Sequence, residues 1–161
     1  MLSTKYFPIE SEDFQKIRKS IQKAKNSNEI ALVVLNNDEL LRKIAEKESQ
    51  IILAADLKNR KDKLYQRDSG FDSVIFKSMT KNNNVYGIIL DEFILSDNLM
   101  EKAKILSRIK QNVKIAKKTK TDVKFIILRE KLKKDHRDLF FFALTLGLAP
   151  KTAKTSTSQD F

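Results

Sequence analysis

The feature that most constrains this 161-residue chain is a repeated alternation of short apolar runs with amphipathic helical segments. Apolar runs without a polar side are typical of strands that are buried on both faces of a parallel sheet. We place such strands at 5–9, 30–35, 51–55, 85–90 and 123–128. In the intervening segments apolar residues recur at helical spacing. The alternation therefore predicts an α/β fold with a parallel sheet.

The length and composition favour a single domain. The chain is long enough to bury one core and short for two. Because 41% of its residues are hydrophobic, disorder is not expected. We assign one α/β domain to 1–150 and a polar tail to 151–161, where Ser, Thr and Lys predominate.

The residue types that are missing exclude several kinds of site. The sequence has no cysteine and a single histidine, His136. Disulfides, thiolate catalysis, cysteine metal sites and multi-histidine metal centres are therefore excluded. No apolar run approaches the length of a membrane span, and the first residues lack a signal-peptide layout. We expect a cytoplasmic protein with no membrane partner, no metal, no other cofactor and no catalytic residue of its own.

The charge is concentrated in one segment. The whole chain carries a net charge of +11, and residues 98–134 hold 13 basic and 3 acidic side chains. The rest of the chain is close to neutral. Such a segment indicates a surface that faces a polyanion. An exposed lysine face on an ordinary surface helix is the alternative interpretation.

A long helix is predicted within this basic segment. Its expected apolar stripe consists of Leu99, Ala103, Leu106, Ile109, Val113 and Ala116. Lysines project from the opposite face and near the end of the helix, where they are suited to neutralising phosphates. On charge alone, we select Lys117, Lys118 and Lys120 as candidate RNA contacts.

The stretch 67–90 predicts a turn, an amphipathic helix and a buried strand. Arg67 begins the turn, and Gly70 suits its tight backbone. Arg67 either presents its guanidinium to phosphate or forms an ion pair with Asp72. Lys77 and Lys81 are spaced to lie on one exposed side of the following helix.

Carboxylates follow several predicted strands, where the active sites of α/β proteins gather. Asp38, Asp56, Asp91 and Glu92 stand at such positions. Together they could hold Mg²⁺ in a small phosphoesterase, which is one alternative function. Helix capping and loop solvation are the simpler explanation.

The stretch also resembles a known family. Residues 67–74 read Arg-Asp-Ser-Gly-Phe-Asp-Ser-Val, and 84–88 read Asn-Val-Tyr-Gly-Ile. With Leu95-Ser-Asp-Asn, Arg137-Asp-Leu, Leu146-Gly-Leu and Ala153-Lys154, they resemble ribonuclease P protein component 3. This is the archaeal counterpart of the thirty-kilodalton protein subunit of the eukaryotic enzyme.

The resemblance implies a TIM-barrel-like α/β fold and a non-catalytic role. Such a subunit binds the catalytic RNA of ribonuclease P, together with a second small protein subunit, component 2. It thereby supports removal of the 5′ leader from precursor tRNA. Precursor tRNA is only an indirect partner of such a subunit. The family motifs add Arg67, Lys77, Lys81, Arg137 and Lys154 to the candidate RNA contacts.

The chain differs from typical family members at both ends. They are longer, with an additional βα portion before the equivalent of residue 30 and a final helix after the equivalent of residue 158. The barrel could therefore be open, smaller, or completed by a partner chain. A protein-interaction scaffold whose basic face meets an acidic partner is a further alternative.

Overall fold

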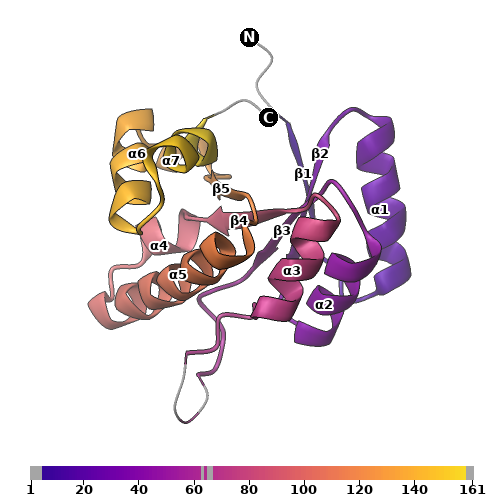
Figure 1. Ribbon diagram of the computed structural model, residues 1–161, viewed down its shortest axis with the longest axis horizontal. Helices are drawn as coiled ribbons and strands as arrows, with labels where there is room; N and C mark the ends of the chain where they lie inside the picture. The colour runs from indigo at the N-terminus through magenta and orange to yellow at the C-terminus, as the bar shows by residue number, and fades with distance from the viewer. Residues whose placement is uncertain (1–4, 63, 65–66, 159–161) are drawn as a thin grey trace.

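The computed structural model describes residues 5–62, 64 and 67–158, which form one parallel β-sheet with helices around it (Figure 1). The strands lie side by side in chain order. They are β1 (Tyr6–Ile9), β2 (Ile30–Leu35), β3 (Ile52–Ala55), β4 (Val85–Ile89) and β5 (Val123–Ile126). Every neighbouring pair is parallel, which confirms the predicted fold class.

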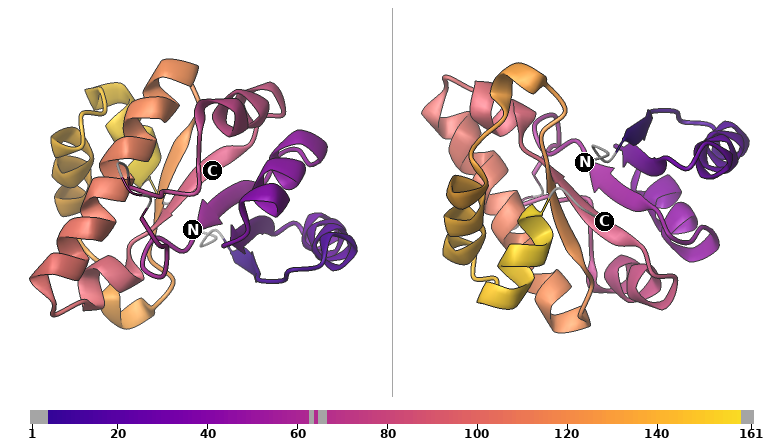
Figure 2. Two further views of the ribbon diagram at one scale, coloured as in Figure 1. Left: turned by 90° about the horizontal axis from the view of Figure 1, so that it is seen from below. Right: turned by 90° about the horizontal axis from the view of Figure 1, so that it is seen from above.

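Helices connect the strands and cover the outside of the curved sheet (Figure 2). They are α1 (Phe14–Asn26), α2 (Asp38–Lys47), α3 (Ser73–Lys81), α4 (Asp91–Leu95), α5 (Leu99–Thr119), α6 (His136–Thr145) and α7 (Pro150–Thr157). A 3₁₀ turn spans Glu130–Leu132. No helix in the described part of the chain is long and apolar enough to cross a membrane.

The sheet is not closed into a barrel. Among the described residues β1 pairs only with β2, and β5 pairs only with β4. Closure would require these two edge strands to be hydrogen-bonded to each other or to further strands. The fold is therefore consistent with part of a TIM-barrel-like architecture.

Both faces of the sheet are buried, as the apolar runs predict. The outer face packs against the helices in the main core, and the inner face forms a smaller cluster. The buried residues of the inner cluster are Leu32, Ile52, Ala54 and Ile126. Gly87 also lies at this inner cluster, where a Cβ atom would stand 2.6 Å from Cγ2 of Ile52. Glycine at this position lets the neighbouring strands pack closely.

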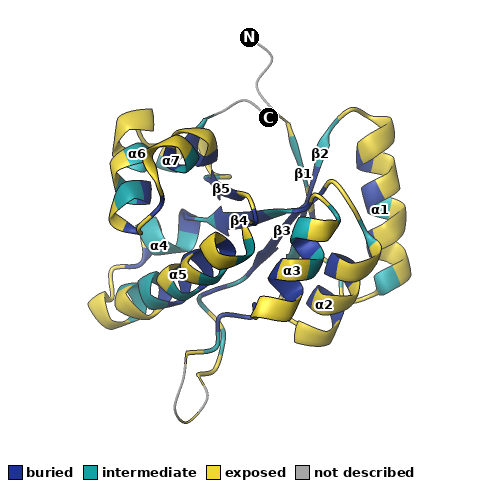
Figure 3. Cartoon of the chain, in the orientation of Figure 1, coloured by how far each residue is buried: buried dark blue, intermediate teal, exposed yellow. Residues whose placement is uncertain are grey.

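Two segments outside the predicted helices are helical. The segment after β4 forms the short helix α4. The 151–161 segment, expected to be a polar tail, is helical through Thr157, and 159–161 lie outside the described residues. Helix α7 has a buried side, visible in Figure 3, made of Ala153, Ser156 and Thr157. Its contacts with α6 and β5 explain why a polar segment is ordered.

Candidate nucleic-acid interface

Helix α5 presents a row of lysines because its opposite side is anchored in the core. Asn98 caps its start by accepting the N–H groups of Met100 and Glu101. The buried side includes Ile105, Ile109, Val113 and Ala116. Helical geometry then turns the lysines outward, and those exposed along the second half of the helix are Lys110, Lys114, Lys117 and Lys118. The predicted candidates Lys117, Lys118 and Lys120 thus lie exposed at its C-terminal end.

The predicted apolar stripe was wrong at the start of the helix. Leu99 is 81% exposed, and Ala103 is also exposed. The buried side begins instead at Ile105 and takes in Arg108, which is only 2% exposed. Lys124, also counted in the basic segment, is buried on the inner face of β5, with Nζ 3.4 Å from Oγ of Ser158. Two of the 13 basic residues are therefore not part of the exposed surface.

A groove with a volume of about 400 Å³ lies between the second half of α5 and the end of α6. Its lining comprises Lys110, Lys114, Lys117, Lys118, Thr145, Leu146 and Gly147. Lys117 Nζ donates a hydrogen bond to the Gly147 carbonyl, which fixes the α6–α7 turn against α5. Four ammonium groups around one groove favour binding of a polyanion. The sequence pattern did not indicate that Thr145 and Gly147 would meet these lysines.

Helix α3 flanks the other side of α5. The Thr80 hydroxyl lies 2.7 Å from the Thr121 hydroxyl and donates to the Thr119 carbonyl at 3.2 Å. The C-terminal ends of α3 and α5 are therefore in contact, which places Lys81 at the same end of the molecule as Lys120. Lys77 is exposed one turn earlier on α3.

Arg67 lies in the turn before the start of α3 and is 41% exposed. Its Nη1 donates to Asp62 Oδ2 at 2.5 Å, so the predicted partner Asp72 is wrong. Asp72 instead caps α3 by accepting the N–H groups of Val74 and Ile75, both at 2.8 Å. Since a guanidinium has five N–H donors, one bond to Asp62 leaves Arg67 with donors for a phosphate.

Asp62 is held by two arginines. Arg108 Nη2 donates to its Oδ1 at 2.7 Å, opposite the bond from Arg67. The hydrogen bond from Arg108, supported by that from Arg67, holds the pKa of the Asp62 carboxyl well below its usual range. The resulting Arg108–Asp62–Arg67 triad retains a net positive charge. Arg67 is the most exposed of its three side chains, and Arg108 is buried.

Buried arginines also fix the rest of the loop between β3 and α3. Arg108 donates to the carbonyls of Leu57 at 2.5 Å and Arg60 at 2.8 Å. The Arg60 side chain is 5% exposed and pairs with Asp38 and Asp68. Gly70, with φ of +77°, lies against Arg60, where a Cβ atom would be 2.7 Å from its Cζ. Arg108 lies one turn after Ile105 and one turn before Asn112, both of which are buried. This spacing along the buried side of α5 was the sequence signal for its role.

The remaining two candidates lie beyond the groove. Arg137 is exposed in the first turn of α6, where its backbone N–H bonds to the capping Asp135. Lys154 is exposed on α7. The eight predicted residues therefore do not form one cluster. They spread over α5 and its flanking helices, with Arg67 toward one end of α3 and Lys81 at the other.

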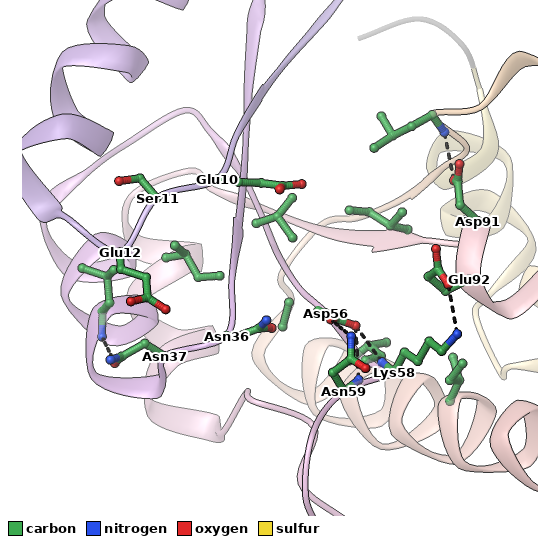
Figure 4. Close-up of a pocket in the computed structure, with 18 of the residues that line it drawn as sticks. Glu10, Ser11, Glu12, Asn36, Asn37, Asp56, Lys58, Asn59, Asp91 and Glu92 are labelled. Atoms are coloured by element: carbon green, nitrogen blue, oxygen red, sulfur yellow. Dashed lines mark hydrogen bonds and ion pairs between the residues drawn. The ribbon is translucent and has the colours of Figure 1, made fainter.

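The carboxylates of the alternative hydrolase site meet at the C-terminal ends of the strands. Asp56, Asp91 and Glu92 line a cavity of about 690 Å³ there (Figure 4). Asp38 instead pairs with Arg60. The three cavity carboxylates have partners within the protein: Asp56 accepts the Lys58 N–H, Asp91 accepts the N–H groups of the second and third residues after β5, and Glu92 pairs with Lys58. Among the described residues no three His, Cys, Asp or Glu side chains are placed to hold a metal ion.

Comparisons with known proteins show similarity at the level of structure. No protein-family model matches the sequence, and no curated protein matches it. A chain in a cryo-EM structure of archaeal ribonuclease P with mature tRNA matches with a TM-score of 0.71 and 22% identity, over 94% of this chain and 63% of that chain. A crystal structure of an uncharacterized protein matches with a TM-score of 0.59 and 13% identity, over 91% and 36%.

These matches show the fold that the chain shares with both structures. The chain spans less than two thirds of the length of either one. The shared portion includes almost all of this chain, so the open five-stranded sheet corresponds to a part of a longer fold in each of them.

Proposed function

We propose that this chain is a non-catalytic, RNA-binding protein subunit of a ribonuclease P. The observation that supports it most is that 94% of the chain shares its fold with a chain of an archaeal ribonuclease P structure. In addition, this chain has an exposed groove lined by lysines. The motifs around Arg67 agree with this assignment. In this role the protein binds the ribonuclease P RNA and supports removal of the 5′ leader from precursor tRNA.

The basic surface supports RNA as the partner, because its charges are not neutralised within the protein. In the described structure Lys110, Lys114 and Lys118 form no salt bridge, whereas Arg60, Arg108 and Arg129 each pair with carboxylates. Exposed ammonium groups release counterions from a phosphate backbone when they bind to it. The proposed protein partner is component 2.

Reconstituted cleavage of precursor tRNA tests the proposal. The matching ribonuclease P RNA is assayed with and without this protein and component 2, over a range of Mg²⁺ concentrations. We expect the protein pair to lower the Mg²⁺ concentration that cleavage requires. If the protein neither binds the RNA nor changes cleavage, the proposal is wrong.

A charge-matched pair of variants makes the test specific. The first combines Lys117→Ala, Lys118→Ala and Lys120→Asn; Asn is used at 120 because Lys120 has φ of +58°. The control combines Lys16→Ala, Lys19→Ala and Lys47→Ala, three exposed lysines on α1 and α2. The first variant should lower RNA affinity and reduce the slope of log K against log salt by about 2, whereas the control should retain both.

A further inference from the structure

Phe141 is an exposed aromatic side chain on α6, one helical turn before Thr145, which lines the lysine groove. It is 62% exposed, and no other Phe or Tyr is exposed in the range that the structure describes, 5–62, 64 and 67–158. The other large exposed apolar side chains in that range are aliphatic or methionine. An exposed ring has a flat apolar surface that water does not hydrate well, and it is a common means of binding a partner.

The surrounding contacts of α6 fix Phe141 in this outward position. The neighbouring Phe142 packs inward, with ring centroids 5.7 Å from Phe93 and 6.0 Å from Phe125. Ala143 is fully buried. Because successive helical residues are rotated by about 100°, these contacts turn residue 141 toward solvent. Phe140 meets the Phe141 ring in a T-shaped contact at 5.6 Å, which orients the ring while leaving most of it exposed.

The exposed side of α6 connects Phe141 with charges at both of its ends. Arg137, Phe141 and Thr145 follow one another at intervals of four residues and are all exposed, so they form one stripe. Thr145 lines the groove together with the lysines of α5. Along α6, Phe141 therefore stands between Arg137 in the first turn of the helix and the lysine groove at its last residue.

We propose that Phe141 is a stacking platform for an unpaired base of a bound RNA whose phosphates follow the lysine groove. This inference rests on the proposed RNA-binding function and adds a nucleotide site to it. Bases in single-stranded RNA stack on aromatic side chains while a positive groove follows the backbone. The lysine groove, whose lining begins one helical turn from Phe141 at Thr145, favours this occupant over an apolar protein surface, which would leave the lysine charges without a counterpart.

The test uses a single-stranded RNA oligonucleotide that contains 2-aminopurine, with the full chain and three variants of it. Phe141→Ala removes the ring, Phe141→Leu keeps an apolar side chain without a flat face, and Phe141→Trp keeps the flat face. Stacking on one side chain corresponds to a loss of roughly tenfold in affinity on truncation to alanine. We expect this loss for Ala and Leu, little loss for Trp, and a 2-aminopurine quench that only Phe and Trp produce.

Salt dependence and an abasic strand separate stacking from charge. Phe141→Ala removes no charge, so the slope of log K against log salt should remain that of the original chain. On an oligonucleotide without bases, Phe141→Ala should have no effect. The control Leu99→Ala removes an exposed apolar side chain, 81% exposed, at the far end of α5 and should leave RNA affinity unchanged.

Three results would overturn the inference. If Phe141→Ala binds RNA as the original chain does while the lysine variant loses affinity, the groove binds RNA without this ring. If Phe141→Ala impairs only association with component 2, the ring belongs to a protein interface. If the original chain binds no RNA, the proposed function fails together with the stacking site.

Discussion

The two halves of helix α5 use positive charge in opposite ways. In the first half Arg108 is buried, and among the described residues its guanidinium donates only to oxygens of the loop after β3. In the second half Lys110, Lys114 and Lys118 line an open groove. The same excess of basic residues thus stabilises a loop at one end and leaves a charged surface at the other.

The difference shows that the number of basic residues in a segment does not define an interface. A guanidinium that is buried against a carboxylate and carbonyls contributes to folding and offers little to a partner. An exposed ammonium contributes little to folding and retains its charge for binding. Substitutions in the two halves of α5 should therefore affect different measurements.

The largest effect is expected from Arg108→Met. The change leaves the Leu57 and Arg60 carbonyls without their donor and removes one of the two arginines that hold Asp62. Loss of a buried charged partner costs about 3 kcal/mol or more. Urea denaturation should show this decrease in the free energy of unfolding. Lys110→Ala, half a turn further along the same helix, is the control and should stay within about 0.5 kcal/mol.

If Arg108→Met were as stable as the original chain, the contrast between the halves of α5 would be wrong. A second readout distinguishes local from global effects. Because Asp62 also accepts from Arg67 and from the Asp68 N–H, loosening of the loop should increase hydrogen exchange there first.

A smaller effect with a defined pH dependence is expected from Asp62→Asn. Hydrogen bonds from Arg108 and Arg67 lower the pKa of this carboxyl in the folded protein. Its stabilisation is therefore complete above the ordinary Asp pKa of about 4 and is lost as the pH falls toward the lower folded-state value. The original chain should be more stable than Asp62→Asn by about 2 kcal/mol near neutral pH, which is typical of charged hydrogen bonds.

Urea denaturation at several pH values checks this dependence. The difference between the two proteins should be constant down to about pH 5 and should narrow below about pH 4. Asp122→Asn is a control, because Asp122 forms no salt bridge with any described residue and the same substitution there should leave the pH dependence unchanged. A difference that did not narrow in acid would show that Asp62 acts through packing and not through its charge.

The order of strands and helices could be predicted because each strand is a local apolar run. Where contacts join distant segments, the sequence was a poorer guide. Asp62 and Asp72 are equally far from Arg67 along the chain. Only the fold shows that the Asp72 carboxylate caps α3 and that Arg67 pairs with Asp62. Barrel closure likewise depends on whether β1 and β5 find partners, which no local pattern contains.

The candidate interface was predicted by charge and only partly by position. Lys118 is exposed because it lies opposite Val113 and Ala116 on the helix, and helical periodicity captures this. Lys117 and Lys120 are exposed because they stand at the C-terminal end of α5, where Lys120 leaves the helix in the left-handed conformation. The groove itself requires Gly147 to lie against Lys117, a contact across 30 residues. Helix α7 was missed since its buried residues are small or hydroxyl-bearing, so their packing against β5 leaves no apolar pattern.

The smallest effect is expected from a single substitution in the groove, Lys114→Ala. It removes one charge from the lining and no side-chain hydrogen bond to the described residues, so the free energy of unfolding should change by less than about 0.5 kcal/mol. RNA binding should respond instead, with the slope of log K against log salt falling by about 0.7 for a single-stranded probe. Lys47→Ala, an exposed lysine on α2, should change neither quantity. Equal slopes for the two variants would mean that the groove does not contact phosphates, and the second half of α5 would then be an ordinary solvated surface.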